Sequence, residues 1–277
     1  PMDQSQGVLF SVAPSFARPI LFSGGLDSAC ALYRALAVGD VLAMSVHTNS
    51  WMQHCQDVVG AGIGDLAPHR LTRLSFRVCL PAGGHETSQR TRGLLFLACG
   101  AMAALAAEAD GIVVAENGIG AINLPYVRTQ HGAEATRSMH PKTLYMFGGF
   151  VSMLTGRDFE VEAPHLGRTK AELVQLTGTE ADKALSHTVS CDKGFSARVK
   201  DRMPCGACTS CILRRQALHA AGRPDIDSRF DYRTPIPTAT QGFAAMAWQV
   251  ARLRRCLASA DPWAELVREF PDLVHLM

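Results

Sequence analysis

The residues at positions 23–28 carry the clearest chemical signal in this sequence. They follow a short apolar run, Ile20–Phe22, and lead into a helical pattern, Leu26–Val38. A turn with two glycines lets backbone N–H groups converge on a phosphate, and the helix N-terminus behind it adds unpaired donors and a positive dipole end. These residues therefore predict a nucleotide phosphate-binding loop, although the Lys of a Walker A loop is absent. The loop consists of Ser23, Gly24, Gly25, Leu26, Asp27 and Ser28.

The side chains of this loop add to the prediction. Ser23 and Ser28 supply hydroxyl donors, and Asp27 supplies a carboxylate that can hold Mg²⁺. The alternative is an ordinary Gly-rich turn between a strand and a helix, of the kind that any α/β protein can contain.

Four of the nine cysteines form a second cluster with the spacing C-x13-C-x2-C-x2-C. Two residues between cysteines let both sulfur atoms reach one tetrahedral ion, and a fourth Cys from upstream completes the ligand set. Four thiolates leave no open position, so we expect a structural zinc site. An iron–sulfur cluster is the alternative metal, and His187 is an alternative fourth ligand. The cysteines are Cys191, Cys205, Cys208 and Cys211.

Composition narrows the class of protein. The 277 residues carry a net charge of +2, which gives no general electrostatic case for binding bulk nucleic acid. The longest apolar run, residues 94–107, is too short to span a bilayer. No secretory signal pattern opens the sequence, so we expect a cytoplasmic protein without a membrane partner.

Apolar runs and helical patterns alternate along the chain, which predicts a Rossmann-like, doubly wound parallel sheet. Ligands of such sheets bind at the carboxyl ends of the strands, so the loop at 23–28 and Glu116 should lie at one edge. The expected strands are Ile20–Phe22, Val41–Val46, Leu74–Leu80, Ile112–Ala115 and Phe159–Val161. The expected helices are Leu26–Val38, Trp51–Ile63, Arg92–Glu108 and Thr143–Leu154.

The remaining segments lack this alternation. Residues 116–142 are rich in Gly, Asn, Pro, Arg and His and predict a long irregular segment, and residues 222–240 predict an extended connector. Helical spacing returns at Phe243–Ala258 and Trp263–Phe270. We therefore expect a nucleotide-binding domain at 19–185, a cysteine region at 186–216 and a C-terminal helical extension at 217–277.

The loop at 23–28 resembles the PP-loop of the ATP pyrophosphatases. Together with the cysteine motif and the following Leu213-Arg214, it resembles the 7-cyano-7-deazaguanine synthase (QueC) family over roughly residues 19–216. Weaker matches are Gln89-Arg90-Thr91-Arg92, which looks like an Arg-bearing helix start, and Ala163-Pro164 with Thr169-Lys170-Ala171-Glu172. The resemblance implies an adenine nucleotide alpha hydrolase-like fold and a homodimer.

The resemblance also implies two ATP-dependent steps. The carboxylate of 7-carboxy-7-deazaguanine would be adenylated and converted by ammonia to an amide, which is then activated again and dehydrated to a nitrile. Catalytic roles are implied for Asp27, Lys170 and Arg90, and nucleotide binding for Arg92 and Glu116 together with the loop. The implied cofactors are ATP, Mg²⁺ and Zn²⁺.

Several residues depart from the family pattern. The family's acidic and aromatic residues after Glu116 are missing from residues 117–125, and its Pro-Gly-Arg-Asn tetrad is replaced at 89–92. The chain also continues past the expected end of the family. These differences indicate a divergent branch, similar to QueC-like proteins of antiphage defence systems. Alternatives are therefore conjugation of the activated deazaguanine to a partner protein or nucleic acid, a PP-loop tRNA-modifying enzyme, or a non-enzymatic zinc-knuckle binding module.

Overall fold

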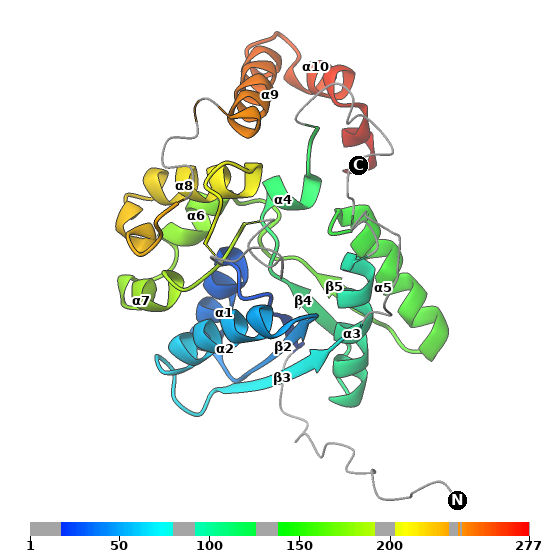
Figure 1. Cartoon of the computed structure of the whole chain (residues 1–277). Coiled ribbons are helices and arrows are strands. Elements are labelled where there is room, and N and C mark those ends of the chain that lie inside the picture. The colour runs from blue at the N-terminus through cyan, green and yellow to red at the C-terminus, as the bar shows by residue number, and fades with distance from the viewer. Residues whose placement is uncertain are drawn as a thin grey trace, which may run out of the picture.

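The computed structural model describes residues 18–79, 92–125, 138–191, 203–232, 238 and 240–276 (Figure 1). Within these residues the strands are β1 Ile20–Leu21, β2 Val41–His47, β3 Leu71–Arg77, β4 Gly111–Val114 and β5 Glu160–Glu162. The helices are α1 Leu26–Val38, α2 Ser50–Gly64, α3 Arg92–Ala106, α4 Gly118–Ile122, α5 Pro141–Thr155, α6 Lys170–Gln175, α7 Asp182–Leu185, α8 Thr209–Ala220, α9 Gln241–Leu257 and α10 Pro262–Glu269. Short 3-10 turns are η2 Thr179–Ala181, η3 Pro224–Asp227 and η5 Pro271–Leu276.

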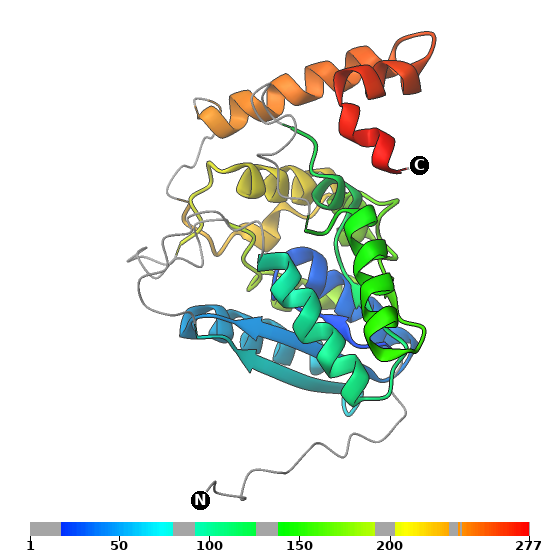
Figure 2. The same ribbon diagram turned by 90° about the vertical axis from the view of Figure 1, so that its right-hand side faces the viewer.

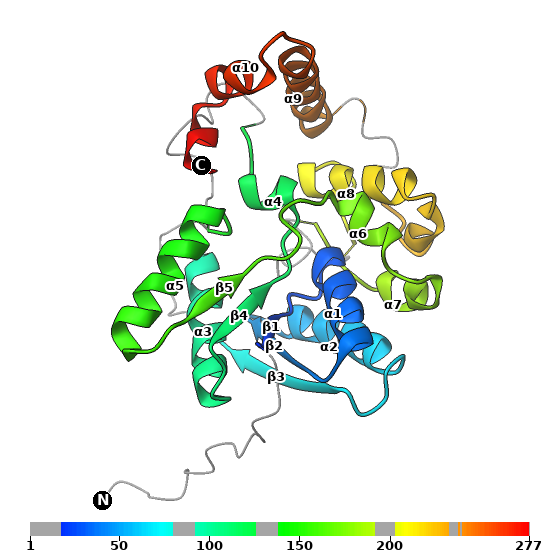
Figure 3. The same cartoon turned by 180° about the vertical axis from the view of Figure 1, so that it is seen from behind.

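All described strands pair in parallel, in the order β3-β2-β1-β4-β5. Helices α1 and α2 cover one face, and α3 and α5 cover the other (Figures 1 and 3). A strand between two helical layers is apolar on both faces, and every residue of β2 is indeed buried. The expected doubly wound α/β sheet is therefore confirmed.

The strand order reverses between β1 and β4, which lie side by side. Their following loops diverge to opposite faces, so a crevice opens between them at the carboxyl edge of the sheet. The loop after β1 begins at Ser23, and the loop after β4 contains Glu116. The fold thus brings together the two segments that the sequence placed at one edge.

The third strand lies at residues 71–77, three residues earlier than the expected Leu74–Leu80. Among the described strands it pairs only with β2, at one edge of the sheet, and its residues are partly buried or exposed. The polar residues Thr72, Ser75 and Arg77 occupy the exposed positions, so apolarity alone misplaced the strand. The pairing of Val41 N–H with the Arg70 carbonyl fixes the observed start.

Two segments expected to be irregular contain short helices. Residues 118–122 form α4, because the Asn117 side chain caps it and Asn123 ends it in a left-handed conformation with φ of +48°. Residues 224–227 form η3 inside the predicted connector, so 222–240 is not extended throughout. Part of the predicted irregular segment, residues 126–137, lies outside the described residues.

The C-terminal residues form a helical unit of α9, α10 and η5, which lies above α8 and α4 (Figures 1 and 2). Helix α8 runs continuously through residue 216, where the sequence predicted a domain boundary. None of the helices in the described parts of the chain is long and apolar enough to cross a membrane.

Candidate active site

The turn between β1 and α1 presents backbone and hydroxyl donors. Gly24 has φ of +76°, which favours glycine, and a Cβ there would lie 3.1 Å from the Cγ atom of Gln56. Ser28 Oγ donates to the Gly25 carbonyl at 3.0 Å and lies 3.1 Å from Ser23 Oγ. Gly25 is the N-cap of α1 and no described side chain caps it, so the first N–H groups of the helix face the loop. This geometry suits a phosphate.

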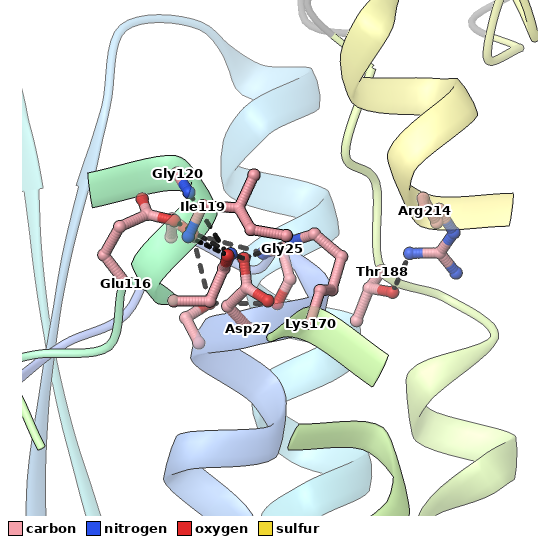
Figure 4. A network of polar contacts seen from close by, with 11 residues as sticks. Gly25, Asp27, Glu116, Ile119, Gly120, Lys170, Thr188 and Arg214 are labelled. Carbon is pink, nitrogen blue, oxygen red and sulfur yellow. Dashed lines mark hydrogen bonds and ion pairs between the residues drawn. The ribbon is translucent and has the colours of Figure 1, made fainter. Parts of the chain in front are cut away.

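Asp27, in the first turn of α1, joins three segments of the chain (Figure 4). Its Oδ2 atom accepts hydrogen bonds from the Lys170 ammonium and from Asn117 Nδ2, the latter at 3.2 Å. Lys170 is only 7% exposed, so this ion pair lies largely out of water. The Asp27 Oδ1 atom is buried and has no hydrogen-bond partner within the described parts of the chain. Burying an anionic oxygen without a hydrogen-bond partner costs free energy. This oxygen is therefore a candidate ligand for a cation.

Glu116 adds a second carboxylate beside Asp27. Its Oε1 atom accepts a hydrogen bond from Asn117 Nδ2 at 3.3 Å. Burial and the nearby charge of Asp27 raise the pKa of Glu116 to about 7. A Cβ at Gly120 would lie 2.2 Å from the same Oε1 atom, so a side chain at this position would displace the carboxylate from where it lies. Asp27 and Glu116 together supply the oxygen ligands that Mg²⁺ prefers.

Local capping positions the partners of Asp27. The Oδ1 atom of Asn117 accepts hydrogen bonds from the N–H groups of Ile119 and Gly120, at 3.0 and 3.2 Å, which directs its Nδ2 toward the carboxylates. Thr169 and Glu172 form a capping box at the start of α6. The box fixes Lys170 as the first residue of that helix, so its side chain reaches Asp27.

The four cysteines of the motif converge on one point. Their Sγ atoms all lie within 4.8 Å of one another. Backbone N–H groups of Cys205, Cys208 and Cys211 donate to the preceding sulfur atoms at 3.3–3.4 Å. Gly206 has φ of +72°, which lets the chain turn between the second and third cysteines. These contacts form the predicted knuckle.

The electrostatics of this centre favour a metal ion. Hydrogen bonding with the Cys191 and Cys208 sulfur atoms raises the pKa of the Cys211 thiol, and burial and the nearby sulfur charges raise it further. A divalent cation reverses this effect and stabilises all four thiolates. His187 instead contacts the Arg229 guanidinium, so the structure gives no support to His187 as a ligand. The residues fit a structural zinc ion.

Arg214 links the knuckle to the rest of the site. Its side chain is 2% exposed, its Nε atom donates to Asp227 Oδ1 at 2.8 Å, and its Nη1 atom donates to Thr188 Oγ1 at 2.6 Å (Figure 4). Thr188 precedes Cys191 by three residues. Arg214 therefore holds helix α8 against the segment that supplies the first cysteine.

The phosphate loop and the knuckle line one cavity of about 450 Å³. Cys191 borders it on one side, and Arg92 and Phe96 of α3 border it on another. A Cβ on Gly25 would lie 3.6 Å from the Val189 carbonyl, so the segment before the first cysteine runs against the loop. The cavity is large enough for a nucleotide-sized ligand.

The family profile described as "Queuosine biosynthesis protein QueC" matches residues 84–222, half of the chain. The chain belongs to the QueC family. It is 30% identical to a 7-cyano-7-deazaguanine synthase of Methylobacillus flagellatus over 227 residues, which are 74% of this chain and 93% of that protein. A protein of the same name from Synechococcus sp. (strain CC9902) is 30% identical over 234 residues, 75% of this chain and 95% of that protein. One from Hydrogenovibrio crunogenus is 27% identical over 230 residues, 74% of this chain and 92% of that protein.

The resemblance to QueC predicted from the sequence is therefore confirmed, together with the class of enzyme, an ATP-dependent ligase. The residue assignments within the QueC family site stay predictions. The structure brings together the loop, Asp27, Lys170 and Glu116, and places exposed Arg92 at the wall of the cavity. Arg90 lies outside the described residues.

One residue of the site, Asn117, and one residue that contacts a neighbouring segment, Gln249, were not assigned a role from the sequence. Asn117 bridges both carboxylates, and its position between a strand and a glycine is a typical helix N-cap signal that could have identified it. Gln249, in the middle of α9, donates to the carbonyls of Leu124 and Pro125, at 2.9 and 3.2 Å. Nothing in the local pattern around Gln249 marks this contact, because it joins segments far apart in the sequence.

Proposed function

We propose that this chain adenylates the carboxylate of 7-carboxy-7-deazaguanine and converts the product with ammonia to the amide, to 7-cyano-7-deazaguanine, or to both. The observation that carries the proposal is the ion pair of Asp27 and Lys170 at the phosphate loop, inside the cavity of a QueC-family chain. A carboxylate is a poor electrophile, so the enzyme must first give it a good leaving group.

The reaction balances in two activations. A carboxylate oxygen attacks the α-phosphorus of ATP, and pyrophosphate leaves with the electron pair of the broken P–O bond. Ammonia then attacks the acyl carbon, loses a proton, and expels AMP to leave an amide. A second ATP adenylates the amide oxygen and releases pyrophosphate. Loss of AMP and of both amide protons then gives the nitrile.

The proposed roles follow from the geometry. The N–H groups and hydroxyls of the loop, with Lys170, hold the pyrophosphate charge as it develops. Asp27 and Glu116 would hold Mg²⁺, which would neutralise negative charge on the phosphates. Arg92 at the cavity wall, and Arg90 by the family resemblance, supply further positive charge. The four cysteines would hold Zn²⁺ and stabilise the wall of the cavity that contains Cys191.

A second candidate function keeps the activation but transfers the acyl group to an amine of a partner protein or nucleic acid. It is supported by the segment after Glu116, where residues 117–125 lack the family's acidic residues and contact a C-terminal unit beyond the family match. The altered residues 117–125 agree with a divergent, defence-associated branch of the family. Adenylation is common to both functions.

A homodimer is the proposed assembly. Helix α5 buries one side and exposes Tyr145, Met146, Phe150 and Met153 on the other, at 50–83% exposure. None of these residues carries a charge, so two copies of this face can pair without like-charge repulsion. The cytoplasm is the proposed location of the protein, since the reaction needs ATP.

The test is a product analysis. The purified chain is incubated with ATP, Mg²⁺, an ammonium salt and 7-carboxy-7-deazaguanine, and the products are identified by mass spectrometry. AMP formed together with the amide or nitrile supports the proposal. AMP formed without either product, but with a modified protein or nucleic acid partner, supports the second candidate. No AMP in the presence of the acid contradicts both.

A further inference from the structure

The outward side of α9 carries an apolar surface where a polar one is expected. The apolar residues exposed along it recur at heptad spacing, and the exposed charged residues of the helix are Arg254 and Arg255. Phe243, Val250 and Leu257 are 36%, 46% and 61% exposed. A helix at a protein surface normally directs such residues inward, so this side is suited to a partner. We call it the outer stripe: Phe243, Ala244, Ala247, Val250, Ala251 and Leu257.

The inward side of α9 is firmly attached, so the helix cannot rotate to bury the outer stripe. Met246, Gln249 and Cys256 are buried, and Gln249 donates to the Leu124 and Pro125 carbonyls. At the start of the helix, a Cβ on Gly242 would lie 2.3 Å from the Ala207 carbonyl of the knuckle. The outer stripe is therefore held in place before any partner arrives, which lowers the entropic cost of binding.

The charge around the outer stripe is one-sided. Helix α9 contains Arg252, Arg254 and Arg255 and no acidic residue. Glu269 of α10 pairs with both Arg252 and Arg255, at 3.1–3.3 Å, so one carboxylate is shared by two of the three guanidinium groups. A second copy of α9 would bring more arginines into the contact, whereas an acidic partner complements it.

The sizes of the side chains in the outer stripe favour a helix over a lipid surface as its partner. Three of the six residues are alanines, which let another helix approach closely but insert little apolar volume into a bilayer. From these observations we infer that the outer stripe docks an amphipathic helix of another protein whose apolar side is flanked by carboxylates.

The test uses two labelled synthetic peptides of about 21 residues, long enough to form a helix. Both carry the same Leu/Ala stripe, and one has Glu flanks while the other has Lys flanks. Binding to the full chain is measured by fluorescence anisotropy. The Glu-flanked peptide should bind about tenfold more tightly than the Lys-flanked peptide, and the difference should shrink as salt increases.

The variant V250D should weaken binding of the Glu-flanked peptide about tenfold, because it places a desolvated carboxylate at the centre of the contact. M102D is the matched control, since Met102 is 57% exposed on α3, away from α9. Circular dichroism melting checks that each variant is folded, and A247D replaces V250D if the latter is not. These readouts do not depend on the proposed reaction.

Four results would overturn the inference. The first is failure of the Glu-flanked peptide to bind, and the second is equal binding of the two peptides. The third is self-association of the wild-type chain, measured by light scattering, that V250D abolishes. The fourth is binding to phosphatidylserine vesicles that V250D abolishes.

Discussion

Lys170 and Asp27 are 143 residues apart in the sequence, and their side chains form an ion pair at the mouth of the phosphate loop. Both side chains are largely buried, at 9% and 15% exposure. The pair thus places a cation within the site where phosphate charge would develop, next to a carboxylate oxygen that has no partner within the described residues.

Replacing Asp27 by Asn should abolish adenylation while the fold is kept. The amide has the size of the carboxylate but is a much weaker ligand for Mg²⁺, so AMP formation should fall at least about 10²-fold. The measurement is the release of AMP from ATP that requires added 7-carboxy-7-deazaguanine. D40N, at an exposed position before β2, is the control and should keep wild-type activity. A wild-type rate of AMP release by D27N would show that Asp27 has no role in adenylation.

Replacing Lys170 by Met should destabilise the chain more than replacing both partners. K170M leaves the Asp27 carboxylate buried without its cation, a change that typically costs about 3–5 kcal/mol. The double variant D27N/K170M removes that charge as well and should recover part of the loss. Urea unfolding of the wild type, D27N, K170M and D27N/K170M measures the four free energies of unfolding. Equal stability of K170M and the double variant would show that the pair is not coupled.

The stability of the ligand-free chain should depend on pH through Glu116. The folded chain keeps this proton up to about pH 7, whereas the unfolded chain releases it near the ordinary pKa of 4.5. The folded state therefore binds more protons between these values, and its stability falls as pH rises through this window. E116Q should flatten the dependence, measured as melting temperature without added Mg²⁺. An unchanged slope in E116Q would contradict the raised pKa.

Removing one knuckle ligand should release the metal. C208S leaves three thiolates, so bound zinc should fall from about one per chain to a small fraction of that, with loss of soluble protein. Elemental analysis of the purified protein checks this. C79S is the control, because Cys79 is an exposed free cysteine outside the cluster. Full zinc content in C208S would contradict the ligand set, and an iron-containing brown protein would favour the iron–sulfur alternative.

Replacing Gln249 should weaken the binding of the deazaguanine acid rather than the binding of ATP. Q249M keeps the volume of the side chain but removes the donor to Leu124 and Pro125, which lie at the end of the α4 segment. We expect the KM for the deazaguanine acid to rise about fivefold to tenfold, with the KM for ATP nearly unchanged. Q241M, an exposed position on the same helix, is the matched control. A parallel rise in both KM values would indicate a general structural role instead.

The sequence by itself determined the local chemistry. The glycines and hydroxyls of residues 23–28 specify a phosphate turn, and the spacing of the four cysteines specifies a tetrahedral centre, because both depend on contacts over a few residues. Alternating patterns also determined the parallel sheet, although edge strand β3 was misplaced because its apolar signal is weak.

Only the tertiary structure decided which distant groups meet. The contacts of Asp27 with Lys170 and Asn117, the shared cavity of the loop and Cys191, and the attachment of α9 through Gln249 all join segments that are far apart in the chain. No local periodicity encodes such pairings, since they arise from the strand order at the switch between β1 and β4 and from the packing of α8 and α9 above it.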